Sequence, residues 1–235
     1  MMILAHRGAS SYAPENTMAA FYKALEMKAN GIELDLKQTK DGEIVVFHDT
    51  DVSRTTNQSG NLRNFTLQEI QEFDAGSWFS GEYTGEKVVR FEDFLYYFGS
   101  KPIYLAIELK DDHIEAAVLA ILQKFELQSK ITITSFNFDN LVRMRSLSQS
   151  IELGFLTNVI TEKIIEQLKE FSIRQICPNG ELLEKEHVEL ARKSELEIRS
   201  WNTSSEEIMQ HVIDCGVDGM TIDFPDKLVE ALDKK

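Results

Sequence analysis

Segment 31–36 reads GIELDL, so aliphatic residues alternate with two acids, Glu33 and Asp35. Because successive side chains of a strand point to opposite faces, both carboxylates lie on one face and the aliphatic groups on the other. Two carboxylates in an apolar run are unfavourable unless a bound cation, basic side chains or water compensate their charge. The segment therefore predicts a polar site built on a strand.

A third acid follows the same pattern in segment 103–110, IYLAIELK, where Glu108 and Lys110 share a face. Together with Glu33 and Asp35, Glu108 would complete a ligand set made of oxygens alone. Hard divalent cations such as Mg²⁺ or Ca²⁺ prefer such ligands, whereas zinc more often recruits imidazole. The alternative is that the acids form an ion-pair network with basic side chains, namely Arg7, Lys37 and Lys110.

Two histidines follow extended apolar runs: His6 comes after segment 3–5, and His48 after segment 43–47. Imidazole titrates near neutral pH, so this pair suits the roles of general acid and general base. Either histidine alone is explained as well by a hydrogen bond at the rim of the fold. Two of them beside three carboxylates favour catalysis.

Further residues after strands suggest what the site binds. Arg7 and Lys110 suit a phosphate group, the first as a bidentate fork and the second as a point charge, although they also balance the acids. Phe136 and Trp201 follow later strands. They are expected to form an apolar wall of the pocket or, as the alternative, to pack against a neighbouring loop.

Strands and helices alternate along most of the chain. The expected strands are 3–5, 31–36, 103–109, 131–134, 151–156, 174–177, 196–201 and 219–222. Helical periodicity marks 114–125, 138–147, 162–171, 182–193, 206–215 and 225–232. This α/β pattern is typical of a (β/α)8 TIM barrel, with a doubly wound open sheet as the alternative. The carboxyl ends of barrel strands open on one rim, where the candidate residues would meet, joined by Asp223 after the last strand.

The first hundred residues add two features to this pattern. Pro14 and Glu15 are expected in the first turn of a helix that runs to about Met27, because proline and acids suit that position. Segment 50–100 mixes polar turns, short helical pieces and clustered aromatics. It is too long for a loop, so we expect a small insertion after the second strand unit, within one domain that covers 1–235.

Composition narrows the class of protein further. The 235 residues carry a net charge of -14, which argues against a nucleic-acid or anionic-membrane surface. Cys177 and Cys215 do not form a disulfide framework or a metal motif, and both are expected as buried thiols. The N-terminus lacks the features of a signal peptide, and no segment has the length of a membrane span. These features predict a cytoplasmic protein with a small-molecule substrate, and they leave a homodimer open.

Several short motifs occur in a specific order. The chain has HRG at 6–8, PENT at 14–17, ELD at 33–35, TKDG at 39–42, HD at 48–49, ELK at 108–110, GVDG at 216–219 and DFP at 223–225. In this combination the chain resembles the glycerophosphodiester phosphodiesterases over nearly its whole length. One departure is WNTS at 201–204, where relatives often read WTVN.

The resemblance implies a TIM barrel with an insertion after the second histidine. It implies a divalent cation, Mg²⁺ or Ca²⁺, held by Glu33, Asp35 and Glu108. It also implies that His6 and His48 are the catalytic pair. For the substrate, it implies that Arg7 and Lys110 contact the phosphate and that Trp201 lines the pocket for the alcohol.

The expected activity is metal-dependent hydrolysis of a glycerophosphodiester to an alcohol and glycerol 3-phosphate. One histidine would take a proton from the nucleophile, and the other would protonate the departing alkoxide. Two alternatives are a lysophospholipase D-like enzyme acting on longer-chain lipids, and a non-catalytic module that binds phosphodiesters. The second predicts loss of a histidine or a carboxylate, and this chain retains all of them.

Overall fold

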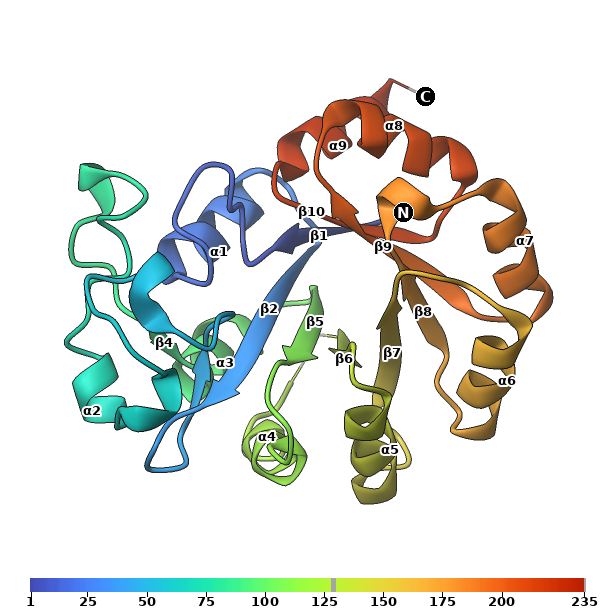
Figure 1. The fold of residues 1–235 in the computed structure, drawn as a ribbon. Coiled ribbons are helices and arrows are strands. Elements are labelled where there is room, and N and C mark those ends of the chain that lie inside the picture. The colour runs from blue at the N-terminus through green and yellow to red at the C-terminus, as the bar shows by residue number, and fades with distance from the viewer. Residues whose placement is uncertain (128–129, 235) are drawn as a thin grey trace.

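Eight parallel strands form a closed ring in the computed structural model, which describes residues 1–127 and 130–234. The strands are β1 (Met2–His6), β2 (Gly31–Gln38), β5 (Tyr104–Leu109), β6 (Lys130–Ser135), β7 (Glu152–Thr157), β8 (Gln175–Pro178), β9 (Glu197–Thr203) and β10 (Gly219–Ile222). The ring closes because β1 pairs in parallel with both β2 and β10. This closure confirms the predicted barrel and excludes the doubly wound open sheet (Figure 1).

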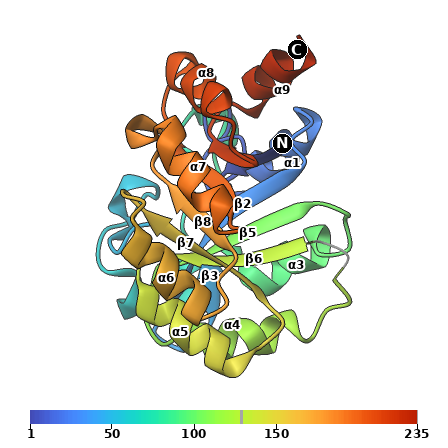
Figure 2. The same ribbon diagram turned by 90° about the vertical axis from the view of Figure 1, so that its right-hand side faces the viewer.

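Helices surround the strands on the outside (Figure 1). They are α1 (Met18–Glu26), α3 (Phe91–Phe98), α4 (Glu115–Leu122), α5 (Phe138–Leu147), α6 (Glu162–Glu170), α7 (Lys185–Lys193), α8 (Glu206–Cys215) and α9 (Pro225–Asp233). The turned view shows α5, α6 and α7 side by side along one flank (Figure 2). Among the described residues, no helix combines the length and the apolar character that crossing a membrane requires.

Local sequence sets where these helices begin and end. In α8 the Ser205 hydroxyl accepts a hydrogen bond from the backbone N–H of Ile208, and Gly216 ends the helix in the left-handed conformation with φ of 86°. The GVDG segment at 216–219 is thus the turn between α8 and β10. α7 begins at Lys185, three residues later than expected, because a short 3-10 helix (Gly180–Leu182) precedes it.

The start of α1 differs more from the prediction. The helix begins at Met18, with Thr17 as its cap, so the expectation that Pro14 and Glu15 lie in its first turn is wrong. Asn16 has a φ of 58°, which is outside the helical region. The chain turns sharply before the helix, and the Glu15 carboxylate faces two arginines rather than the end of α1.

β2 divides two environments, as its alternation predicted. Ile32, Leu34 and Leu36 are fully buried in the main hydrophobic cluster between strands and helices. That cluster includes the aromatic contact of Phe21 in α1 with Phe94 in α3, whose ring centroids lie 4.9 Å apart. The acids of β2 point to the inside of the barrel.

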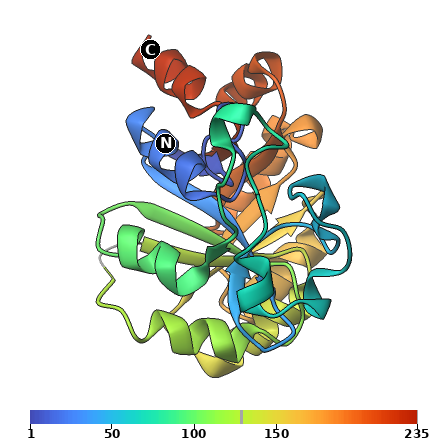
Figure 3. The same ribbon diagram turned by 90° about the vertical axis from the view of Figure 1, so that its left-hand side faces the viewer.

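Residues between β2 and α3 lie at the side of the barrel (Figure 3). β3 (Ile44–Val46) turns back antiparallel to β2, and β4 (Val89–Arg90) pairs with β3. Between them lie α2 (Leu67–Ile70) and three 3-10 helices, at Val52–Arg54, Leu62–Asn64 and Gly81–Tyr83. Residues from segment 45–88 form a separate hydrophobic cluster, whereas α3 packs in the main cluster. The treatment of 50–100 as one insertion stays a prediction.

Candidate active site

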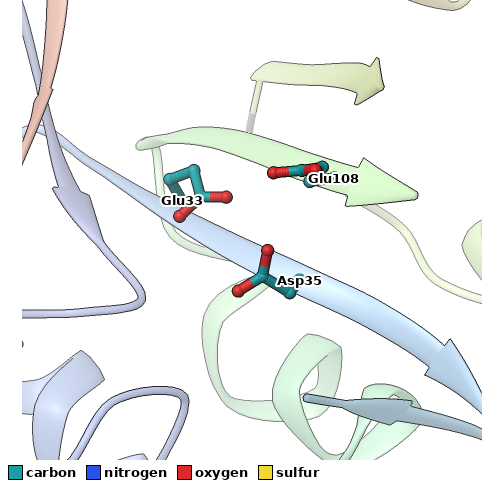
Figure 4. Close-up of side chains that lie close together, drawn as sticks. All are labelled: Glu33, Asp35 and Glu108. Carbon is teal, nitrogen blue, oxygen red and sulfur yellow. The ribbon is translucent and has the colours of Figure 1, made fainter. Parts of the chain in front are cut away.

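Three buried carboxylates meet inside the barrel. Glu33 and Asp35 come from β2 and Glu108 from β5, and the strand register pairs Asp35 directly with Glu108. One ligand oxygen from each residue lies within 4.8 Å of the other two. Figure 4 shows the three groups turned toward one another. The alternation noted in both strands therefore brings together the three acids selected from the sequence.

The three carboxyl groups have different pKa values because of their surroundings. Burial raises the pKa of Glu33, and the charge of Asp35 adds to this effect. Burial and the same neighbouring charge raise the pKa of Glu108 to about 7. Burial acts in the same direction on Asp35, but the neighbouring cationic groups, Arg7 foremost, and a hydrogen bond from Asn16 together outweigh it and lower the Asp35 pKa. Glu33 and Glu108 are therefore held in a site that disfavours their ionised forms.

Two of the three basic residues in the ion-pair alternative do contact the acids. Arg7 Nε lies 3.2 Å from Asp35 Oδ2, and Lys110 Nζ lies 2.8 Å from Glu108 Oε1. Lys37 instead pairs with Asp111 at 2.9 Å, away from the cluster. Asp35 Oδ1 is nevertheless buried without a hydrogen-bond partner among the described residues. Lys110 Nζ lies 4.0 Å from this oxygen, so ion pairing reaches it but leaves it without a hydrogen bond among the described residues.

Each histidine of the pair is oriented by a carboxylate. His6 Nδ1 bonds to Asp223 Oδ1 at 2.6 Å, and its Nε2 lies 4.0 Å from Glu33 Oε2. His48 Nδ1 bonds to Asp49 Oδ1 at 2.5 Å. Burial acts to lower the pKa of His6, but the hydrogen bond to Asp223 and the charges of Glu33 and Asp223 together outweigh it and raise that pKa. Burial lowers the pKa of His48.

A cavity of about 220 Å³ at the carboxyl ends of the strands connects these groups. Its lining includes eight of the nine residues selected from the sequence, namely His6, Arg7, Glu33, His48, Glu108, Lys110, Phe136 and Trp201. Asp35, the ninth, lies directly behind them against Arg7. A larger open cavity of about 750 Å³ lies beside α3, and its lining contains none of the nine.

One wall of the site cavity is aromatic. The rings of Phe136 and Trp201 meet edge to face, with centroids 4.9 Å apart. Lys110 Nζ lies 5.8 Å from the centroid of Phe136, and Trp201 Nε1 donates to the Thr157 carbonyl oxygen at 3.3 Å. The wall therefore faces the charged groups across the cavity, and Trp201 is fixed by its hydrogen bond.

Sequence reasoning missed several polar residues of the site. Asp223 was expected on the same rim as the candidate residues, but its bond to His6 was not anticipated. Arg199 is 1% exposed, lines the cavity and bonds to neutral partners such as Gln175 Oε1 at 3.0 Å. Thr134 Oγ1 is buried there without a hydrogen-bond partner among the described residues. The inward face of β9, shared by Arg199 and Trp201, was the signal available for the arginine.

Comparison with known proteins points to one family. The sequence model of the Glycerophosphoryl diester phosphodiesterase family matches residues 6–227. YhdW of Bacillus subtilis strain 168 is 38% identical over 241 residues, covering 98% of this chain and 97% of the relative. A glycerophosphodiester phosphodiesterase of Caldanaerobacter subterraneus subsp. tengcongensis is 32% identical over 241 residues, covering 99% and 98%.

A solved structure agrees with this match. The Oleispira antarctica phosphodiesterase OLEI02445, in complex with the product sn-glycerol-3-phosphate, superposes with a TM-score of 0.94 at 26% identity. The superposition covers 99% of this chain and 97% of that protein. The similarity thus extends over the whole barrel and the segment between β2 and α3.

Proposed function

This chain belongs to the glycerophosphoryl diester phosphodiesterase family and is a phosphodiesterase, and we propose that it cleaves glycerophosphodiesters to an alcohol and glycerol 3-phosphate. We propose further that it uses a divalent cation and the pair His6 and His48. The observation that carries this proposal is the single cavity lined by acids, histidines, cationic groups and an aromatic wall. The product bound to the Oleispira relative supports the choice of substrate.

The donor set suits a hard divalent cation. Glu33, Asp35 and Glu108 offer only oxygens, and these lie close enough together to share one ion. Asp35 Oδ1, which has no hydrogen bond within the described part of the chain, and the raised pKa values of Glu33 and Glu108 are the features that such an ion would relieve. A bound Mg²⁺ or Ca²⁺ would supply positive charge to the phosphate oxygens as negative charge develops on them.

Arg7 and Lys110, which both contact the acids, bind the phosphate. The Arg7 guanidinium presents planar donors to two oxygens, and the Lys110 ammonium supplies a point charge. Both groups are already fixed by carboxylates, Arg7 by Asp35 and Lys110 by Glu108, so little rearrangement is needed when substrate binds. These local charges are needed because the whole chain, at -14, repels an anion.

The histidines move the protons. Each uses Nδ1 to bond a carboxylate, His6 to Asp223 and His48 to Asp49, which leaves each Nε2 for the reacting groups. One imidazole takes a proton from the attacking hydroxyl, which belongs either to water or to the glycerol, and the other gives a proton to the departing alkoxide. The aromatic wall of Phe136 and Trp201 holds the carbon part of the substrate.

The size of the cavity favours a small diester. At about 220 Å³ it lies below the range of about 300–1,000 Å³ typical of sites for drug-sized ligands. A water-soluble glycerophosphodiester therefore suits it better than a lysolipid. The cytoplasmic location expected from the sequence stays a prediction, and so does the homodimer that the sequence leaves open.

The test is turnover of glycerophosphocholine by purified protein. Treatment with EDTA should abolish turnover, and Mg²⁺ or Ca²⁺ should restore it. His6→Ala and His48→Ala should each lose about 10²- to 10⁴-fold in kcat, while His187→Ala, on α7 outside the cavity, should behave as wild type. Near-normal turnover by either active-site variant would rule out the two-histidine mechanism, and full activity in EDTA would rule out the cation.

A further inference from the structure

Arg54 lies outside the site cavity but contacts two carboxylates, each of which hydrogen-bonds a residue that lines it. It is the last residue of the 3-10 helix Val52–Arg54, in the segment between β3 and β4. The Asp51 side chain caps this helix, and Val52 is 1% exposed in the small hydrophobic cluster. The backbone of Arg54 is therefore held in place, while its side chain is 45% exposed.

The first carboxylate is Glu15, which joins Arg54 to Arg7. Glu15 Oε1 accepts hydrogen bonds from Arg7 Nη1 and from Arg54 Nη2, both at 2.8 Å. Its Oε2 accepts from Arg54 Nη1 at 2.7 Å. The side chain of Glu15 is only 12% exposed, so one nearly buried carboxylate holds two guanidinium groups.

The second carboxylate is Asp49, which joins Arg54 to His48. Asp49 Oδ2 accepts from Arg54 Nε, and Asp49 Oδ1 accepts from His48 Nδ1 at 2.5 Å. Burial acts to raise the pKa of Asp49, but the hydrogen bonds from Arg54 and His48, supported by the charge of Arg54, outweigh it and lower that pKa to about 2. Asp49 is thus kept ionised and is fixed from both sides.

We propose that Arg54 is a positioning residue that sets Arg7 and His48 at the correct distance from each other across the cavity. The inference rests on the proposed function, because it takes the phosphate-binding role of Arg7 and the proton-transfer role of His48 from there. A continuous chain of hydrogen-bonded groups carries the effect, in the order Arg7, Glu15, Arg54, Asp49 and His48.

The geometry of guanidinium is essential to this arrangement. Arg54 directs its two Nη groups at Glu15 and its Nε at Asp49, so one rigid plane spans two acids. Lysine keeps the charge but has a single nitrogen, which cannot hold both carboxylates in this way. Without the plane, Glu15 and Asp49 are free to rotate, and displacement of a reacting group by about 1 Å can cost about 100-fold in rate.

The experiment compares Arg54→Ala and Arg54→Lys with a matched control, Arg63→Ala. Arg63 lies in the next 3-10 helix of the same segment, is 49% exposed and pairs with a single acid, Asp111, at 3.4 Å. Activity on glycerophosphocholine is measured with the cation-loaded protein. We expect both Arg54 variants to lose about 10- to 100-fold in kcat/KM, with melting temperatures like that of Arg63→Ala, and Arg63→Ala to remain within twofold of wild type.

Two further measurements separate positioning from a general structural role. Millimolar methylguanidinium should restore part of kcat in Arg54→Ala and none in Arg54→Lys. The second measurement is NMR of the imidazole nitrogens in the cation-free protein. The signal of the His48 Nδ1–H should be visible, because it is protected from solvent exchange, in wild type and in Arg63→Ala. In Arg54→Ala this signal should be lost. This readout holds even if wild type fails to hydrolyse the diester, a result that would refute the proposed function alone.

The proposal is overturned if Arg54→Ala keeps kcat/KM within twofold of wild type, or keeps the protected His48 signal. It is also overturned if Arg63→Ala loses as much activity as Arg54→Ala, because the loss would then follow from replacing any arginine of the segment.

Discussion

Replacement of Glu108 by glutamine should stabilise the cation-free protein at alkaline pH while it removes cation binding. Glutamine has the shape of the protonated carboxylic acid but never ionises. In the native structure the pKa of Glu108 rises from its ordinary value of 4.5 to about 7, because the group is buried and faces Asp35. The native state therefore binds a proton more tightly here than the unfolded chain does.

The expected magnitude follows from this shift. A change of one pKa unit corresponds to about 1.4 kcal/mol, so the rise to about 7 costs roughly 3 kcal/mol when Glu108 is fully ionised. The cost is absent below pH 4.5, grows between pH 4.5 and about 7, and is complete above that range. For a chain of this size the gain in Glu108→Gln at pH 8 corresponds to a melting temperature higher by roughly 6–12 °C.

The assay is thermal unfolding of wild type and Glu108→Gln in EDTA, at pH 5 and pH 8, and again with Mg²⁺ or Ca²⁺. Wild type should gain stability from the cation, and more at pH 8 than at pH 5. Glu108→Gln should be the more stable protein in EDTA at pH 8, nearly equal to wild type at pH 5, and indifferent to the cation.

Glu115→Gln is the matched control. Glu115 is also a buried glutamate, 3% exposed, but it lies in α4 and pairs with Arg143 at 2.8 Å outside the site. This variant should lose stability at both pH values and keep the response to the cation. The reasoning fails if Glu108→Gln is less stable than wild type at pH 8, or if the cation still raises its melting temperature.

Three other variants test separate parts of the structure. Asp223→Asn should lower kcat/KM by up to about 100-fold. It should also move the limb of the pH–rate profile governed by His6 to lower pH, since Asp223 raises the pKa of that imidazole. An unchanged profile would contradict the pairing. Trp201→Ala should raise KM several-fold with a smaller change in kcat, measured by steady-state kinetics, and the reverse pattern would count against a binding role. Thr17→Ala removes the cap of α1 and should cost about 1 kcal/mol in unfolding free energy, with activity retained.

The barrel could be predicted from the sequence because each of its units carries a local signal. The strands are short apolar runs bounded by turn residues, and helical periodicity follows most of them. Alternation within β2 and β5 also placed Glu33, Asp35 and Glu108 correctly, because a strand side chain has only two directions to point. The general rule that the carboxyl ends of barrel strands open on one rim then predicted where the candidate residues meet.

What the sequence could not provide are contacts between irregular segments. Pro14 and Glu15 have the composition of a helix start, but a sharp turn at Asn16 takes Glu15 to the arginines instead. Arg54 lies in a segment without periodicity, and nothing in its neighbourhood indicates that it reaches Glu15 and Asp49. Such hydrogen bonds depend on how a loop folds over the barrel, which no local pattern records.

The position of β1 in the ring has a consequence for biosynthesis. β1 carries His6, yet it is completed by β10, and Asp223, directly after β10, orients that histidine. Some two hundred residues of chain must leave the ribosome before these partners exist, so the nascent protein spends its synthesis with an open edge at β1 and with His6 lacking its carboxylate partner. Docking of the final β/α unit closes the edge and supplies this carboxylate in the same event, which makes the onset of phosphodiesterase activity a direct report of barrel closure.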